Sequence, residues 1–219
     1  MPEGPSIFLM KEAATQFEGK KISAVSGNTK IDKAPLLNKK VIAVKSWGKH
    51  FLICFKGFTV RIHLLMFGSY RINEKKETPA RLSLTLKNGE LNFYACSVKI
   101  IEGDINDVYD FTSDVMNDDW DAKAAKKKLV LIPETLICDA LLNQNIFAGV
   151  GNIIKNEVLY RVKIHPKSKV GKIQMLKLNK LIKEARNYSF DFLKWKRDYV
   201  LKKNGLPIQK RVVYRATYH

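Results

Sequence analysis

Two neighbouring residues near the start of the chain carry the functional groups of covalent catalysis. If Met1 is removed, Pro2 presents a secondary α-amine, a class of group with a pKa of about 8 that is partly unprotonated at neutral pH. Such an amine attacks electrophilic carbon to form an iminium, as in Schiff-base catalysis. Glu3 follows directly and can act as a general acid or base. Proline at this position is also common without a catalytic role, so the pair by itself is only a hypothesis.

Two later segments carry side chains that could meet a ligand. In residues 46–53, Lys49 follows Gly48 at the expected start of a strand, where an ammonium can reach a phosphate, although an isolated lysine is more often solvated surface. In residues 63–70, three large apolar side chains lead into a glycine turn: Leu65, Met66 and Phe67. Core packing is the default explanation for them. The alternative is an exposed wedge of the kind that enters a base stack.

Residues 143–152 join two expected helices by a turn that contains two glycines. The glycines allow the backbone to approach a ligand closely. Asn152 would open the second helix, whose outward-facing N–H groups and positive dipole end form a phosphate site. A purely structural helix–turn–helix would use glycine in the same way, so the spacing leaves both interpretations open.

The periodicity of the chain predicts an α+β protein. A helix is expected to begin with Ser6 as its cap, and short β-type runs follow, at residues 40–46, 50–55, 59–63 and 81–86. Their hairpin turns predict a β-sandwich or barrel, and we assign a β-sandwich to residues 1–110. An acidic stretch at 111–120 is expected to be a linker. A helical domain should occupy 121–219, with helices near 135–143, 152–162 and 171–194 and a terminal hairpin at 202–219.

The charge of the chain points to a polyanionic partner. Its 39 Lys and Arg against 21 Asp and Glu give a formal charge of +18, and nucleic acid is the first candidate. An anionic membrane surface is the second candidate, and a basic surface for solubility is the alternative without a partner. We find no run of about 18 apolar residues and no signal peptide. The three cysteines, Cys54, Cys96 and Cys138, make no close pair and are expected as buried thiols of a reducing, cytoplasmic compartment.

These segments, in this order, resemble the formamidopyrimidine-DNA glycosylase and endonuclease VIII family over nearly the whole chain. The opening Met1-Pro2-Glu3-Gly4-Pro5 and residues 91–97 look closer to the endonuclease VIII branch. The resemblance implies that Pro2 is the nucleophile at C1′ of a damaged nucleotide and that Glu3 assists opening of the sugar ring. It implies base excision through an iminium, followed by β- and usually δ-elimination that cuts the strand, without metal or organic cofactor.

The same resemblance assigns DNA-binding roles along the chain. Lys49 is similar to a lysine that holds the lesion phosphate and assists catalysis, and His63 to a histidine that contacts phosphate. Leu65, Met66 and Phe67 match the loop that fills the space left by the extruded nucleotide. Gln144, Gly151 and Asn152 match the helix–two-turn–helix element, with Asn152 on the phosphate. The implied partner is double-stranded DNA with damaged bases or abasic sites, bound by a monomer that does not contact membrane.

The chain departs from the family pattern in three places. Ser6 stands where many relatives have a glutamate, which puts that supporting role in doubt. The cysteine pairs of the family's C-terminal zinc finger are absent, so we expect a metal-free hairpin that presents Arg215 to a phosphate. A retained Met1 would make the Pro2 nitrogen an amide, which cannot attack. Residues 190–204 are short where relatives that bind 8-oxoguanine carry a loop, which favours oxidised pyrimidines and hydantoin-type lesions.

Two alternatives belong to other functional classes. A non-catalytic binder of damaged or abasic DNA could keep the family fold, and the departures at Ser6 and in the finger are compatible with it. A basic helix–turn–helix protein of RNA or the ribosome would not need proline at the terminus. Loss of a covalent intermediate on Pro2→Ala separates an enzyme from a binder, and preference for lesion DNA over structured RNA separates the third class.

Overall fold

The computed structural model describes residues 2–203. The chain divides into two compact units: one holds Pro2 and Ile7–Tyr109, and the other holds Glu3–Ser6 and the chain from Asp110 onward. The predicted terminal hairpin, Arg215 included, lies outside the described residues except for its first two positions, which end the last helix.

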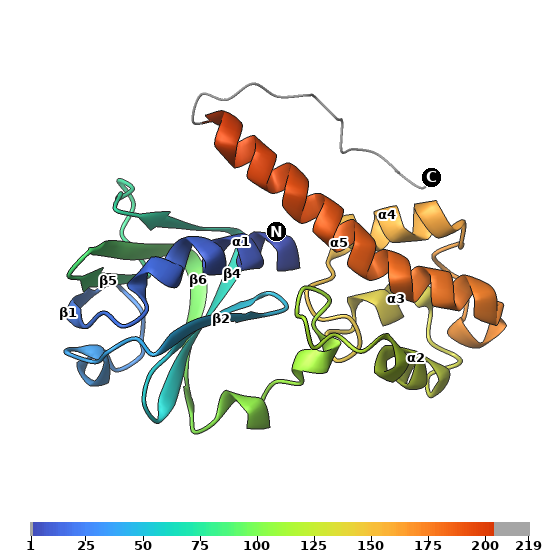
Figure 1. Cartoon of the computed structure of the whole chain (residues 1–219), viewed down its shortest axis with the longest axis horizontal. Coiled ribbons are helices and arrows are strands. Elements are labelled where there is room, and N and C mark those ends of the chain that lie inside the picture. Colours follow the sequence, from blue (N-terminus) through green and yellow to red (C-terminus); the bar gives the residue numbers. More distant parts are fainter. Residues whose placement is uncertain (1, 204–219) are drawn as a thin grey trace. The chain divides into compact units, whose positions relative to one another are not determined.

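The first unit is built on six strands that pair only antiparallel (Figure 1). They are β1 (Ile22–Ser26), β2 (Ala43–Trp47), β3 (His50–Cys54), β4 (Phe58–Ile72), β5 (Leu82–Leu86) and β6 (Gly89–Glu102). Their order in the sheet is β1-β5-β6-β4-β3-β2. The strands of the expected sandwich form one continuous hydrogen-bonded sheet, with the long strands β4 and β6 paired at its centre. The α+β class is confirmed.

The core of this unit lies between the sheet and the first helix, α1 (Gly4–Ala14). Ile7, Met10 and Ala14 recur at helical spacing and are fully buried with apolar residues of all six strands. The helix begins two residues before the predicted cap, Ser6. Short 3₁₀ turns complete the unit: η1 (Thr15–Phe17), η2 (Ala34–Leu36) and η3 (Ile105–Asp107).

The second unit is helical in its described part (Figure 1). Its elements are η4 (Phe111–Ser113), α2 (Ala122–Val130), α3 (Ile137–Leu142), α4 (Asn152–Val162), η5 (Val170–Lys172) and α5 (Met175–Lys203). The observed bounds of α4 are those predicted, α3 is shorter than predicted, and α5 begins later and runs to Lys203. Residues 190–203, interpreted from sequence as the place of a shortened loop, therefore continue the helix.

The acidic stretch at 111–120, predicted to be a linker, is partly buried. Ser113, Asp114, Val115 and Met116 are buried, and the Asp114 carboxylate accepts the backbone N–H of Met116 at 2.9 Å. The neighbouring aspartates act as caps: Asp110 caps η4, and Asp121 accepts two N–H groups at the start of α2. Capping and turn formation thus account for several of the acidic residues in and beside this stretch.

The cysteines are free thiols in partly different settings from those predicted. Cys96 is buried, and this burial raises its pKa to about 11, whereas Cys54 and Cys138 are partly exposed. Between residues 2 and 203, no helix combines the length and apolar character needed to cross a membrane.

Candidate active site

Glu3 is the most firmly held of the predicted site residues. Its side chain is 3% exposed, and its carboxylate accepts the backbone N–H groups of Gly151 at 3.1 Å, Ile153 at 2.8 Å and Ile154 at 3.2 Å. These donors are at the N-terminus of α4, where unpaired N–H groups and the helix dipole favour an anion. The carboxylate one residue after Pro2 is therefore held as an anion by a helix that begins about 150 residues later in the chain.

This arrangement corrects one expectation from sequence. The N-terminus of α4 was predicted to present open N–H groups to a phosphate, but Glu3 occupies three of the donors there. The anion that the helix terminus binds is a carboxylate of the protein itself. The sequence could not reveal this, because nothing local links Glu3 to the turn before Asn152.

The glycines of the turn are required by this close approach. A Cβ on Gly151 would lie 2.4 Å from Cδ of Glu3, which is closer than any real contact. On the other side of the turn, the Gly4 N–H donates to the Gly149 carbonyl at 2.8 Å, and a Cβ on Gly4 would lie 3.0 Å from Cα of Gly149. Gly149 itself has φ +97°, a region open mainly to glycine.

Gln144 and Asn152 differ in how their amides are used. The Gln144 amide donates to the carbonyls of Leu142 at 2.8 Å and Val150 at 3.1 Å, and its oxygen accepts the Gly149 N–H at 3.0 Å. It thus closes the turn between α3 and α4. Asn152 is exposed at the first position of α4 and accepts a hydrogen bond from the Lys155 ammonium at 3.0 Å.

In the sheet unit, Lys49 and His63 lie together. Trp47 pairs with His50 across the β2–β3 hairpin, so Gly48 and Lys49 form its two-residue turn, with φ of Gly48 at +53°. The neighbouring strand β4 brings His63 opposite His50, and Nδ1 of His63 lies 3.2 Å from the Lys49 carbonyl oxygen. Because a carbonyl only accepts, Nδ1 of His63 carries the proton in this bond.

Sequence reasoning missed an aromatic and imidazole cluster beside these two residues. Nδ1 of His50 lies 3.1 Å from the hydroxyl of Tyr109, and the His50 ring meets His63 edge-on at 5.1 Å between centroids. Burial, helped by the positive charges of Arg61, His63 and Lys49, lowers the pKa of His50 to about 3. The imidazole within the otherwise apolar run 50–53 was the available signal, but its partners depend on strand register.

Burial is also the main cause that lowers the pKa of His63, with smaller contributions from the Arg61 and Lys49 charges. The hydrogen bond to the Lys49 carbonyl opposes this shift. His63 is therefore neutral at pH 7, and its Nε2 then carries a lone pair rather than a proton.

Leu65, Met66 and Phe67 are exposed rather than packed in the core. Their exposed fractions are 49%, 66% and 85%. The cause is an irregularity in β4: Leu64 pairs with Cys96 and Ser69 with Tyr94, so four residues on β4 face one on β6. Gly68 closes the protrusion, because a Cβ there would lie 2.8 Å from the Ala95 carbonyl oxygen.

The predicted residues that the structure describes are thus divided between the two units. Lys49, His63 and the apolar protrusion belong to the sheet unit, and Glu3, Gln144, Gly151 and Asn152 belong to the helical unit. No cluster of three or more side chains that could ligate a metal lies within residues 2–203.

Both units match domains of one class of DNA-repair protein. Residues 1–96 match the N-terminal domain of formamidopyrimidine-DNA glycosylase, and residues 110–188 match the helix–two-turn–helix domain of the same enzyme. The chain belongs to the formamidopyrimidine-DNA glycosylase and endonuclease VIII family of DNA-repair enzymes.

Named relatives come from both bacteria and animals. The chain is 28% identical over 181 residues to the DNA-(apurinic or apyrimidinic site) lyase Nei2 of Mycolicibacterium smegmatis, covering 80% of this chain and 72% of the relative. It is 30% identical over 158 residues to mouse Endonuclease 8-like 3, covering 68% of this chain but only 26% of that longer protein.

Solved structures support the fold. A viral DNA glycosylase superposes with a TM-score of 0.78 at 21% identity, over 94% of this chain and 87% of the other. Lactococcus lactis Fpg in complex with DNA that contains N7-benzyl-Fapy-dG superposes with a TM-score of 0.77 at 22% identity, over 88% and 79% of the two chains. At this identity the likeness shows the fold alone.

Proposed function

We propose that this chain is a bifunctional DNA glycosylase and abasic-site lyase that works through a Schiff base at Pro2. The observation that carries the proposal is the position of Glu3, which follows Pro2 directly in the chain. Its carboxylate is buried and accepts three backbone N–H groups. A fixed carboxylate beside a terminal secondary amine is the pairing of nucleophile and proton carrier that such chemistry requires.

The reaction begins with the lone pair of the Pro2 nitrogen. It attacks C1′ of the damaged nucleotide, the glycosidic bond breaks, and the base leaves as an anion that takes a proton from water. Glu3 relays the amine proton to the ring oxygen as the C1′–O4′ bond opens, which leaves an iminium between C1′ and Pro2. Loss of a C2′ proton then expels the 3′ phosphate oxygen. Loss of a C4′ proton in a second elimination expels the 5′ phosphate oxygen.

DNA binding is assigned to both units. Lys49 at the hairpin turn and His63 beside it would hold phosphates around the lesion, and Asn152 and Arg215 would contact the backbone from the second unit. Because the Gln144 amide is used within its turn, we give it and Gly151 a positioning role.

The apolar protrusion, residues 65–67 of β4, would fill the space left by an extruded nucleotide. For substrate we propose oxidised pyrimidines and hydantoin-type lesions, because residues 190–203 continue a helix and offer no loop to enclose an oxidised purine.

The test traps the iminium. Protein freed of Met1 is incubated with duplexes that contain thymine glycol, 8-oxoguanine or an abasic site, and borohydride is added. We expect a stable protein–DNA adduct that peptide mapping assigns to the Pro2 nitrogen, that Pro2→Ala abolishes, and that is strongest with thymine glycol among the base lesions. Protein that retains Met1 is the matched control, because its Pro2 nitrogen is an amide and should give none.

Absence of an adduct on the abasic duplex, with a free Pro2 verified by mass spectrometry, would remove the lyase assignment. A non-catalytic binder of damaged DNA would then replace it. An adduct strongest with 8-oxoguanine would keep the enzyme and overturn only the lesion class.

A further inference from the structure

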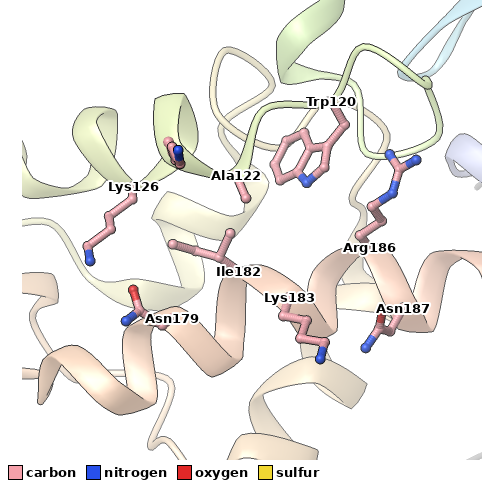
Figure 2. Close-up of a pocket in the computed structure, with 9 residues that line it drawn as sticks. Trp120, Ala122, Lys126, Asn179, Ile182, Lys183, Arg186 and Asn187 are labelled. Carbon is pink, nitrogen blue, oxygen red and sulfur yellow. The ribbon is translucent and has the colours of Figure 1, made fainter.

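The helical unit contains a cavity that the proposed chemistry does not use. It has a volume of about 460 Å³ and is bounded by α2, α5 and Trp120, which precedes α2. Figure 2 shows the Trp120 indole and the Arg186 guanidinium on one side, and Lys126 with Asn179 on the other. Ile182 and Ala122 lie between them as an apolar floor.

Four cations line this cavity: Lys123, Lys126, Lys183 and Arg186. Within residues 2–203 none of them forms an ion pair with a carboxylate, whereas elsewhere in the same unit Lys128 pairs with Asp110 at 2.7 Å and Lys169 pairs with Glu134 at 2.7 Å. Four like charges around one cavity repel one another, and this repulsion is relieved when an anion enters.

Arg186 is the fixed member of the set. Its Nη1 donates to the carbonyl oxygens of Val115 at 3.1 Å and Asn117 at 2.6 Å, and its guanidinium lies 5.0 Å from the centroid of Phe190. Its Nε and Nη2 have no hydrogen-bond partner in the part of the chain that the structure describes. These two nitrogens lie on one edge of the guanidinium. Such an edge can donate two parallel hydrogen bonds to a phosphate.

The neutral lining selects among anions. The Trp120 indole offers a flat apolar surface, and the exposed amides of Asn179 and Asn187 can donate to and accept from the edge of a base or a sugar. An aromatic platform combined with cations is the pattern that binds single-stranded nucleic acid, through base stacking and phosphate contacts. An acidic peptide would use the cations but not the indole.

We propose that this cavity is a second nucleic-acid site, which binds one nucleotide of an undamaged single strand by stacking its base on Trp120 and placing its phosphate among Lys126, Lys183 and Arg186. The site requires neither Pro2 nor a lesion. Its presence or absence is therefore independent of the glycosylase chemistry.

The experiment uses the three tryptophans of the chain as reporters. Indole N–H signals of ¹⁵N-labelled protein are followed by NMR during titration with 5′-phosphorylated trithymidylate, and Trp120→Phe assigns the Trp120 signal. Trp47 lies in the sheet unit beside His50, at 5.6 Å between ring centroids, and reports binding there. We expect a saturable shift of the Trp120 signal with its own midpoint.

Paired charge reversals separate a site from general attraction. The double variant Lys126→Glu with Lys183→Glu should weaken the affinity measured from the Trp120 signal about tenfold or more, because two phosphate contacts are lost. Lys127→Glu with Lys180→Glu is the matched control, since these exposed lysines lie on the same two helices outside the cavity and carry the same change of charge. The control pair should weaken this affinity less than about threefold.

Several results would overturn the proposal. Equal weakening by both pairs would mean that net charge alone attracts the strand, and a shift confined to Trp47 would leave the cavity empty. Thymidine monophosphate binding as tightly as the trinucleotide would assign the cavity to free nucleotides instead. Tighter binding of hexaglutamate at Trp120 would assign it to an acidic protein segment.

Discussion

At the scale of single residues, the space between Glu3 and Gly151 leaves no room for a side chain at position 151. We predict that Gly151→Ala displaces the Glu3 carboxylate, because the new Cβ would lie 2.4 Å from Cδ of Glu3. Borohydride trapping on an abasic duplex should fall by about tenfold or more, as expected when a proton carrier is misplaced.

Gly171→Ala provides the control for that variant. Its Cβ would lie 2.8 Å from Cβ of Pro133, so it crowds the same unit without touching Glu3. Both variants should lose about 1–3 kcal/mol of unfolding free energy in urea. An equal loss of trapping in both would mean that stability, and not the position of Glu3, limits the reaction.

The protonation state of His63 leads to a prediction on pH. With Nδ1 donating to the Lys49 carbonyl, neutral His63 can only accept at Nε2, and a phosphate oxygen there requires a second proton. Phosphate binding should therefore raise the pKa of His63 from its lowered value in the free protein. The contribution of His63 to affinity is full below the pKa that His63 has in the free protein. It is lost as pH rises through the pKa that His63 has in the DNA complex.

Affinity for a duplex with a tetrahydrofuran abasic analogue, measured by fluorescence anisotropy, should thus rise about three- to tenfold from pH 7.5 to 5.5. His63→Gln should flatten this dependence. His165→Gln, which removes an exposed histidine of the other unit, should preserve it. The groups around His63 are His50, Arg61 and the Lys49 ammonium, and the His50 pKa of about 3 keeps that ring neutral throughout this range. An unchanged slope in His63→Gln would rule out the phosphate contact.

At the scale of elements, a change in the protrusion of β4 should affect DNA binding without affecting the stability of the fold. Phe67 is 85% exposed, so Phe67→Ala should change the free energy of unfolding by less than about 0.5 kcal/mol. If residues 65–67 enter the base stack, the same change should slow extrusion of the lesion by about tenfold, which corresponds to about 1.4 kcal/mol.

Extrusion can be followed by the fluorescence of 2-aminopurine placed beside the lesion. Leu176→Ala is a suitable control, because Leu176 is 81% exposed on α5 of the other unit. We expect that control to alter neither stability nor extrusion. Extrusion at the wild-type rate in Phe67→Ala would show that the protrusion does not enter the stack.

At the scale of the whole molecule, we expect the charge of +18 to govern encounter with DNA. Affinity for an undamaged duplex should fall linearly with the logarithm of salt concentration, with a slope steeper than about −3. The rate of adduct formation at saturating protein should change little with salt, because the proposed reaction at Pro2 involves no counterion release. A shallow slope would mean that the excess of lysines serves solubility rather than binding.

The sequence by itself determined the features that depend on neighbouring residues. The start of α4 at Asn152 was predictable because a turn with two glycines comes directly before it. The pairing of Pro2 with Glu3, and the position of Lys49 after a turn glycine, are likewise local. Resemblance to the family rested on the order of such segments.

Only the tertiary structure decided which groups meet across long stretches of chain. It placed Glu3 on the N-terminus of α4, closed the Gln144 amide within its turn, and exposed Phe67 at an irregular strand pairing. It also buried His50 against Tyr109. The physical reason is that these contacts depend on strand register and on the packing of helices, and neither is encoded in any short run of residues.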